Sequence, residues 1–236
     1  MFGGNPFPLD AFGTCRAAHV LVTRWCLLLG VFALATLAPM NSLRAQTVSF
    51  GGQTVGSSPA DFEISRTGNG APARWIIVRD ETADGGIALE QASQDTADYR
   101  FPLAIYKAFD GVNVDVQTRF KPMSGKLDQS GGIAVRLASP DDYYIVRANA
   151  LEDNVRFYRV VKGRRQLLKS ASVKVAPKEW HTLALKAEGD RFTVTFDGTA
   201  LYTVADKTLS KAGKVALWTK SDSVTRFDRL EIKALP

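Results

Sequence analysis

The sequence predicts an all-β protein in which two antiparallel sheets pack as a sandwich. Almost every apolar run between Thr47 and Ile232 alternates with period two, the spacing of side chains along a strand. Gly- and Asp-rich turn formers separate these runs, and no segment beyond Gln46 sustains the 3.6-residue period of a helix. Short strands at this spacing are typical of β-sandwiches and β-barrels.

The individual strands follow from the apolar runs between successive turn formers. In chain order, the predicted strands are 47–50, 74–78, 87–91, 99–106, 112–120, 132–138, 143–150, 154–161, 165–169, 180–187, 191–196, 200–204, 213–220 and 224–232. Asp197-Gly198 is the clearest hairpin signal, because both residues tolerate positive φ. The Gly-, Ser- and Pro-rich residues 51–73 predict a long loop, and residues 205–213 predict one helical turn.

The first 45 residues have the pattern of a signal peptide. Arg16 and Arg24 precede an apolar run at 25–38, which is shorter than the roughly 20 residues that span a bilayer. A small residue, Ala45, stands at the expected cleavage point before Gln46. We therefore expect a periplasmic or secreted protein with one domain at 46–236 and no membrane span after cleavage; the alternative is an uncleaved N-terminal anchor.

Cysteine usage and charge narrow the possible partners. Both cysteines, Cys15 and Cys26, lie in the predicted leader, so the mature domain is expected to fold without disulfides. The formal net charge is +6, and basic residues alternate with acidic ones. A nucleic-acid interface would need a basic stripe with interleaved aromatic residues. None is found, so nucleic acid is not an expected partner, and no feature predicts an oligomeric state.

Candidate catalytic residues are few. Glycoside hydrolysis normally uses two carboxylic acids at a fixed separation. Asp115 stands alone on its strand, and Glu152, next to Asp153, is another candidate acid. His181 follows Trp180 at a strand start without a Ser or Cys nucleophile motif, which favours a structural role. The sequence therefore predicts no complete catalytic pair.

Metal ligands are also scarce. Asp141 and Asp142 follow Ser-Pro, and their oxygen atoms could belong to a structural Ca²⁺ loop. Ordinary turn chemistry explains the same residues. One histidine and no cysteine remain beyond the leader, which argues against a transition metal. No other cofactor is expected.

A binding face is the remaining possibility. Polar and aromatic residues alternate along neighbouring predicted strands, so they share one side of a sheet. These residues are Arg136, Arg147, Asn149, Asn154, Arg156, Trp218 and Lys220. Aromatic rings pack against the C–H faces of sugars, while Arg and Asn side chains bind hydroxyl groups. We expect a carbohydrate ligand; alternatively, the arginines solubilise an exposed face and Trp218 fills the core.

Several segments carry a family resemblance. They are "FKPMSGKLDQSGGIAVRL", "DDYYIVRANALEDNVRFYRV", "EWHTLALKAEGDRFTVTFDGTALY" and "AGKVALWTKSDSVTRFDRLEI". The chain from about Arg74 to Ile232 resembles concanavalin A-like, or laminin-G-like, jelly rolls. Among these it is most similar to the bacterial 3-keto-disaccharide hydrolase domain family, formerly a domain of unknown function. The resemblance implies two curved antiparallel sheets and a concave face that meets carbohydrate in relatives.

The sequence departs from these relatives at the acidic positions that would take part in hydrolysis. Relatives carry "GIFLR" on one strand, matched here by Gly132–Arg136, and "E-I-Q-I-x-D" on the next. Here Tyr144, Val146 and Asn149 stand where the acidic residues and glutamine would be. We therefore expect an exported carbohydrate-binding protein without a complete glycosidase pair. The alternatives are a hydrolase of 3-keto-disaccharides or related glycosides, and a laminin-G-like protein-interaction module.

Overall fold

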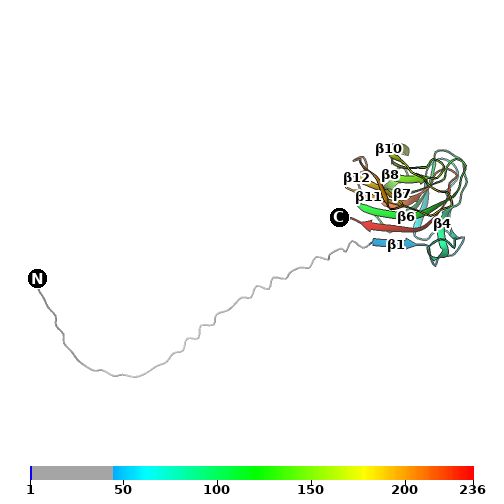
Figure 1. Ribbon diagram of the computed structural model, residues 1–236, viewed down its shortest axis with the longest axis horizontal. Helices are drawn as coiled ribbons and strands as arrows, with labels where there is room; N and C mark the ends of the chain where they lie inside the picture. Colours follow the sequence, from blue (N-terminus) through cyan, green and yellow to red (C-terminus); the bar gives the residue numbers. More distant parts are fainter. Residues whose placement is uncertain (2–44) are drawn as a thin grey trace, which may run out of the picture. The chain divides into compact units, whose positions relative to one another are not determined.

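The computed structural model describes Met1 and residues 45–236, and the latter form two antiparallel sheets (Figure 1). The strands are β1 (Ala45–Ser49), β2 (Phe62–Gly68), β3 (Trp75–Arg79), β4 (Ile87–Gln91), β5 (Arg100–Tyr106), β6 (Val114–Ser124), β7 (Ser130–Ser139), β8 (Asp142–Asn149), β9 (Asn154–Val161), β10 (Arg164–Ser172), β11 (His181–Glu188), β12 (Arg191–Phe196), β13 (Thr199–Ala205), β14 (Lys214–Trp218) and β15 (Val224–Ala234). One 3₁₀ turn, η1 (Asp84–Gly86), precedes β4.

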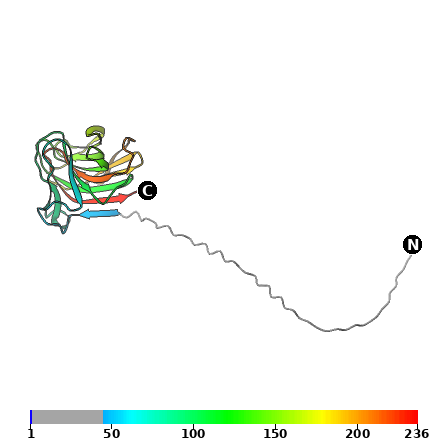
Figure 2. The same cartoon turned by 180° about the vertical axis from the view of Figure 1, so that it is seen from behind.

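Sheet A has the strand order β13-β12-β11-β6-β15-β4-β3, and sheet B has the order β10-β9-β8-β7-β14-β5-β2. One edge of β15 is shared between two partners. Its residues 225–227 pair with β4, and its residues 229–233 pair with β1. A register shift between Phe227 and Arg229 separates the two stretches. Figure 2 shows β1 in blue and β15 in red lying side by side.

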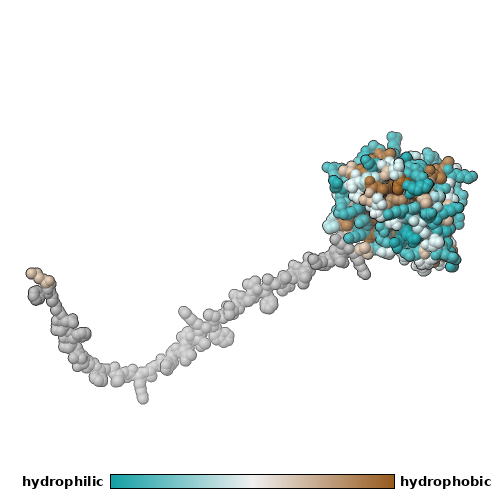
Figure 3. Space-filling view, viewed as in Figure 1, coloured by the Kyte–Doolittle hydropathy of each residue, from teal (hydrophilic) through white to brown (hydrophobic). Residues whose placement is uncertain are grey.

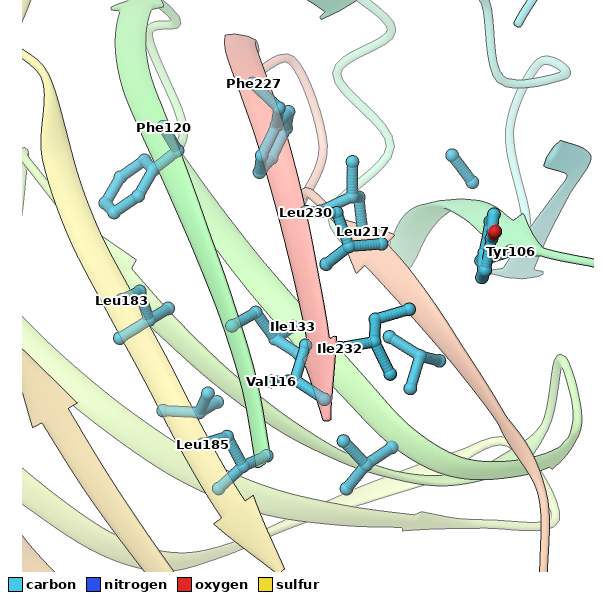
Figure 4. Close-up of a cluster of buried hydrophobic side chains, with 14 of the residues drawn as sticks. Tyr106, Val116, Phe120, Ile133, Leu183, Leu185, Leu217, Phe227, Leu230 and Ile232 are labelled. Carbon is cyan, nitrogen blue, oxygen red and sulfur yellow. The ribbon is translucent and has the colours of Figure 1, made fainter. Parts of the chain in front are cut away.

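The main core lies between the sheets. Alternate residues of each strand point inward, as period-two patterning requires. Leu183, Val116 and Leu230 of sheet A meet Ile133 and Leu217 of sheet B, and all are fully buried (Figure 4). Burying each such side chain contributes about 1.5–3 kcal/mol, so this layer is the main source of stability in a domain without disulfides.

Sheet B also buries part of its other face. A second apolar cluster lies there, and none of its members is more than 5% exposed. Its members are Phe101, Leu103, Ile105, Ala134, Leu137, Tyr143, Ile145, Tyr158, Val160, Ala216 and Trp218. The face on which we predicted a binding site is therefore buried and apolar over this part of sheet B. Strands buried on both faces read as continuous apolar runs, as in the segment Tyr143–Val146.

Sheet B curves toward this second cluster. Three strands separate β5 from β9, so their side chains would lie about 19 Å apart on a flat sheet. Yet the Arg165 guanidinium carbon lies 4.7 Å from the Phe101 ring of β5 and 4.5 Å from the Tyr158 ring of β9. Only a strongly concave outer face allows one side chain to touch both rings. In the space-filling view, hydrophobic surface gathers where β8 and β10 are labelled in Figure 1 (Figure 3).

Most predicted strands are confirmed, and three of them (87–91, 154–161 and 191–196) have the predicted bounds. The tight hairpin is also confirmed, since Asp197 and Gly198 have φ values of 45° and 77°. Two predictions are wrong. The expected loop at 51–73 contains β2, an edge strand with few apolar residues to reveal it. Residues 205–213 form no helical turn, because the Asp206 carboxylate accepts the Thr208 N–H in an extended segment.

The predicted leader falls outside the described residues, apart from Met1 and Ala45. Gln46, the expected first residue of the mature chain, pairs with Ile232 in β1 and donates a side-chain hydrogen bond to the Tyr106 hydroxyl. Within the described part of the chain, no helix combines the length and hydropathy needed to cross a membrane.

Candidate functional site

Polar side chains replace the apolar ones at one end of the concave face of sheet B. We call them the polar cluster: Asp128, Arg147, Asn149, Glu152, Asn154, Arg156 and Lys220. Arg147 pairs with Arg156 across β8 and β9, and Asn149 pairs with Asn154. Asp128 lies just before β7 and Lys220 just after β14. Five of the seven residues predicted for the binding face thus lie together.

Glu152 stands between two guanidinium groups. Its Oε2 accepts hydrogen bonds from Arg147 Nη2 at 2.9 Å and Asn154 Nδ2 at 3.0 Å, and it lies 3.0 Å from Arg156 Nη1. Partial burial alone would raise the pKa of Glu152. The hydrogen bonds from Asn154 and Arg147, with the charges of Arg147 and Arg156, instead lower it to about 2. Glu152 therefore offsets the repulsion between two arginines that face each other across the strands.

Arg147 is the buried centre of the cluster, with 2% of its surface exposed. Its Nη1 donates to Asn154 Oδ1 at 2.7 Å, and its Nη2 also reaches the Tyr158 hydroxyl at 3.4 Å. Its Nε is buried and has no hydrogen-bond partner. Three of its contacts are to side chains, which can rearrange, rather than to fixed backbone.

Asp128 is a buried acid that sequence reasoning missed. It is 1% exposed, and its Oδ1 accepts hydrogen bonds from the Ser130 and Ser223 hydroxyls. Its Oδ2 has no hydrogen-bond partner, and Lys220 Nζ lies 3.5 Å away. Burial raises the pKa of Asp128, although the Ser130 hydrogen bond and the charges of Arg147 and Lys220 act in the opposite direction. Its position two residues before the start of β7 was the only available signal.

Four buried polar atoms in this cluster form no hydrogen bond with the protein: Asp128 Oδ2, Arg147 Nε, Asn149 Nδ2 and Arg156 Nε. Most buried side-chain polar atoms in proteins are hydrogen-bonded to protein or to ordered water, so four together mark a place where water or a ligand can bind. The cluster reaches solvent through Glu152 and Arg156, whose side chains are 39% and 35% exposed. The arrangement offers one acceptor and three donors beside an exposed edge.

Arg136 is not part of this cluster, which corrects the expectation that it acts beside Arg147. The backbone of β7 bulges between Val135 and Ser139, and Arg136 has a φ of 50°. The bulge breaks the alternation on which the prediction depended. Its guanidinium donates to the carbonyl oxygens of Val112, Leu209 and Gly189. The residue is a buried structural clamp.

Trp218 lies on the predicted face but is fully buried, so it is not an open stacking platform. Its ring stacks on Phe101 with centroids 5.3 Å apart, and its Nε1 donates to the Tyr143 hydroxyl at 3.2 Å. Curvature of sheet B covers it, and it fills the second apolar cluster instead.

The three catalytic candidates lie apart. Asp115 is on β6 of sheet A, between Lys186 and Lys233 of the neighbouring strands. His181 begins β11, and its ring nitrogens lie 2.8 Å from Asp197 Oδ2 and 2.9 Å from the Ala176 carbonyl. Both ring nitrogens are therefore engaged by the protein itself, which fits a structural role. Only Glu152 belongs to the polar cluster.

Asp141 and Asp142 form the β7–β8 turn. The Asp142 carboxylate accepts hydrogen bonds from the Ser139 hydroxyl at 2.9 Å and the Lys162 N–H at 3.0 Å. Ser139 Oγ also accepts the Asp141 N–H at 3.1 Å. Among residues 45–236, no group of three or more His, Cys, Asp or Glu side chains is placed to hold a metal ion.

Comparisons with known proteins agree with this architecture. Residues 123–235, a little under half of the chain, match the family described as the C-terminal lectin domain of galactocerebrosidase. A search of curated proteins finds no match. Carbohydrate-binding module CBM66 from Bacillus subtilis has a similar structure, with a TM-score of 0.56, 17% identity, and coverage of 72% of this chain and 95% of that one.

Two further structures are similar. A protein of unknown function with a galectin-like fold from Bacillus subtilis has a TM-score of 0.52 and 8% identity, covering 74% of this chain and 89% of that one. A β-1,3-1,4-glucanase (lichenase) from a mouse hindgut metagenome has a TM-score of 0.52 and 14% identity, covering 81% and 99%. The chain therefore has a lectin-like β-sandwich fold, with carbohydrate-binding modules and glycoside hydrolases among its structural neighbours.

Proposed function

We propose that this protein binds carbohydrate through the polar cluster. The observation that carries the proposal is the group of buried atoms on Asp128, Arg147, Asn149 and Arg156 that form no hydrogen bond with the protein. A sugar hydroxyl both donates and accepts hydrogen bonds, so neighbouring hydroxyls can satisfy the Asp128 oxygen and the nitrogens of the other three side chains together. The two arginines are charged, and charge-assisted hydrogen bonds are about twice as strong as neutral ones.

The cluster is also well ordered for such a ligand. Glu152 and Asn154 hold the Arg147 guanidinium from one side, and Asn149 Oδ1 accepts the N–H groups of Leu151 and Glu152. A pre-positioned site loses less conformational entropy on binding. The similarity to a lectin domain and to a carbohydrate-binding module supports the same ligand class.

Two nearly isosteric variants test the proposal. Asn149→Asp keeps the oxygen that caps the turn but removes the unpartnered donor, and Asp128→Asn replaces the unpartnered acceptor. We expect each to weaken binding on a glycan array, and in titration of the best glycan, by about ten- to a hundredfold. Asp115→Asn, on sheet A, is the control and should bind normally. Lack of binding by the unaltered domain, or equal binding by all variants, would contradict the proposal.

A hydrolytic function is the second candidate, because two acids of the cluster have pKa values displaced in opposite directions. Burial raises the pKa of Asp128, whereas the pKa of Glu152 is lowered to about 2. Such a pair suits a general acid and a carboxylate base or nucleophile. In this case the substrate would be a 3-keto-disaccharide or a related glycoside. Turnover of a 3-keto-disaccharide that is lost in Asp128→Asn would support it, and absence of turnover would exclude that substrate.

Export is part of the proposal. The apolar run at 25–38 and the small residue Ala45 suit a cleaved leader, which would deliver the domain to the periplasm or the exterior. N-terminal sequencing of the exported protein should begin at Gln46. Protein that retains residues 1–45 would contradict this part of the proposal alone.

A further inference from the structure

Arg165 lies between two aromatic rings on the concave face of sheet B. Its guanidinium carbon is 4.7 Å from the Phe101 ring centre and 4.5 Å from that of Tyr158. Phe101 is backed by Trp218 at 5.3 Å. We call the space between the Phe101 and Tyr158 rings the aromatic slot. In this structure, a side chain of the protein itself fills the slot.

A clasp holds Arg165 in place. The Tyr99 hydroxyl accepts the Arg165 N–H at 2.8 Å and donates to the Gly163 carbonyl at 2.7 Å. Tyr99 precedes β5, whereas Gly163 and Arg165 belong to the β9–β10 hairpin, so the clasp joins opposite sides of the curved sheet. Tyr99 is 39% exposed. Water can replace both hydrogen bonds when the clasp opens.

The contacts of Arg165 are weaker than those of the buried arginines. Among residues 45–236 it forms no ion pair within 4.0 Å, although a planar guanidinium suits carboxylates well. Its Nη1 is buried without a hydrogen-bond partner. Arg136, by contrast, makes hydrogen bonds to backbone carbonyls from Nε and from both Nη atoms. Ring faces hold the Arg165 guanidinium, and another flat group could take its position.

We propose that the aromatic slot is a second saccharide subsite beside the polar cluster, and that Arg165 occupies it until a ligand displaces it. This inference rests on the proposed carbohydrate function. Tyr158 is a shared wall, because its ring faces Arg165 while its hydroxyl accepts a hydrogen bond from Arg147 at 3.4 Å. A sugar ring presents flat C–H faces that stack between aromatic rings, as the guanidinium does here.

Ligand length decides whether Arg165 has to move. A monosaccharide fills the polar cluster and leaves the Arg165 side chain in the slot. An oligosaccharide needs the adjoining slot, so part of its binding free energy is used to displace that side chain. Emptying the slot by mutation, or loosening the hairpin that carries Arg165 by removing the Tyr99 hydroxyl, should therefore favour oligosaccharides alone.

Calorimetric titration of variants at Arg165 and Tyr99 tests whether the slot binds part of an oligosaccharide. The probes are cellohexaose, laminarihexaose, xylohexaose and a fructan hexasaccharide, each compared with its monosaccharide. We expect Arg165→Ala to bind a hexasaccharide about five- to tenfold more tightly, the range of one aromatic–cation contact, and Tyr99→Phe to show a smaller gain. Monosaccharide affinity should not change. Arg164→Ala, on the exposed neighbouring residue, is the matched control and should behave as the unaltered domain.

The outcomes separate the two proposals. Equal or weaker hexasaccharide binding by Arg165→Ala would overturn the displaced-arginine subsite while leaving the polar cluster as the binding site. Normal binding by Asn149→Asp, together with a gain in Arg165→Ala, would instead contradict the polar cluster and retain the slot. Absence of binding of every probe to every variant would overturn both. Thermal melting checks that each variant is folded.

Discussion

Arg136 and Arg147 are both buried on strands of sheet B, with 3% and 2% of their surfaces exposed, yet their surroundings differ. The Arg136 guanidinium donates only to backbone carbonyls. The Arg147 guanidinium donates only to side chains and leaves its Nε without a partner. Backbone partners are fixed by the strands and loops that carry them, whereas side-chain partners can exchange for a ligand. Burial alone therefore does not distinguish a structural arginine from a site arginine.

The pKa values of the buried arginines also differ between those bound by backbone carbonyls and the one bound by side chains. Arg100 resembles Arg136, because it donates to the carbonyls of Ala71, Pro72 and Ser221, and burial lowers the pKa of both. Burial would also lower the pKa of Arg147, but Tyr158, Asp128 and Glu152 raise it overall. Acidic neighbours keep the Arg147 guanidinium charged in the place where a ligand is proposed.

The sharpest test of this comparison is Arg136→Ala. It removes three hydrogen bonds between the buried guanidinium and backbone carbonyl oxygens, and hydrogen bonds to charged groups contribute about 1.5–3 kcal/mol each. We expect a loss of about 3 kcal/mol or more in the free energy of unfolding, measured by urea denaturation. Arg191→Ala, on an exposed strand start, should change it by less than 0.5 kcal/mol or so. A loss near that of the control would show that the clamp is dispensable.

Arg147→Ala should have the opposite balance. We expect glycan affinity to fall about ten- to a hundredfold, with a smaller loss of about 1–2 kcal/mol in stability. The stability loss is limited because Glu152 is 39% exposed and can be hydrated after the change. Titration and denaturation of the same preparation measure both effects. A stability loss as large as that of Arg136→Ala would make Arg147 a structural residue and remove the centre of the site.

Acid should weaken the domain partly through Glu152. Its pKa in the folded protein, about 2, is below its ordinary value of 4.5, so its contribution to stability is present above pH 4.5. That contribution is lost as the pH falls from about 4.5 toward 2. Urea denaturation of Glu152→Gln across this range should give a flatter pH profile than the unaltered domain. Identical profiles would mean that the ion pairs of Glu152 do not contribute.

The smallest expected effect on stability is that of Asp128→Asn. Because the pKa of Asp128 is raised, its protonated form is favoured in the folded state, and that stability is lost as pH rises through the folded pKa. The amide resembles the protonated acid, so we expect a slight gain in melting temperature at pH 7, although glycan binding is weakened. A marked fall in melting temperature would show that the Lys220–Asp128 contact stabilises the fold.

Most strands and turns could be predicted from the sequence, because each is defined by residues close together in the chain: a period-two run and the turn formers on either side of it. The polar edge strand β2 was missed, since pairing with β5 and not its own sequence defines it. The grouping of Arg147, Asn149, Asn154 and Arg156 followed from side-chain alternation on two adjacent strands.

Features that depend on distant contacts could not be predicted. The bulge at Arg136 packs against Gly213, where an added Cβ would lie 2.5 Å from the Arg136 carbonyl carbon. The curvature of sheet B brings Arg165 to Phe101 across four strands, which no local pattern contains. For the same reason Trp218 is covered, and Asp128, from a loop, joins the site.

The segment Tyr143–Val146 of β8 is buried on both faces, so it has no outward side on which to carry charge. It is uncharged and rich in aromatic and β-branched residues, and such segments assemble between chains when exposed. Asp142 and Arg147 lie directly on either side of this run. In the unfolded chain Arg147 is thus a gatekeeper whose charge keeps molecules apart, and its loss should increase light scattering during refolding more than the loss of Arg156. Arg147, the central residue of the proposed site, would thus also reduce aggregation of the chain before it has folded.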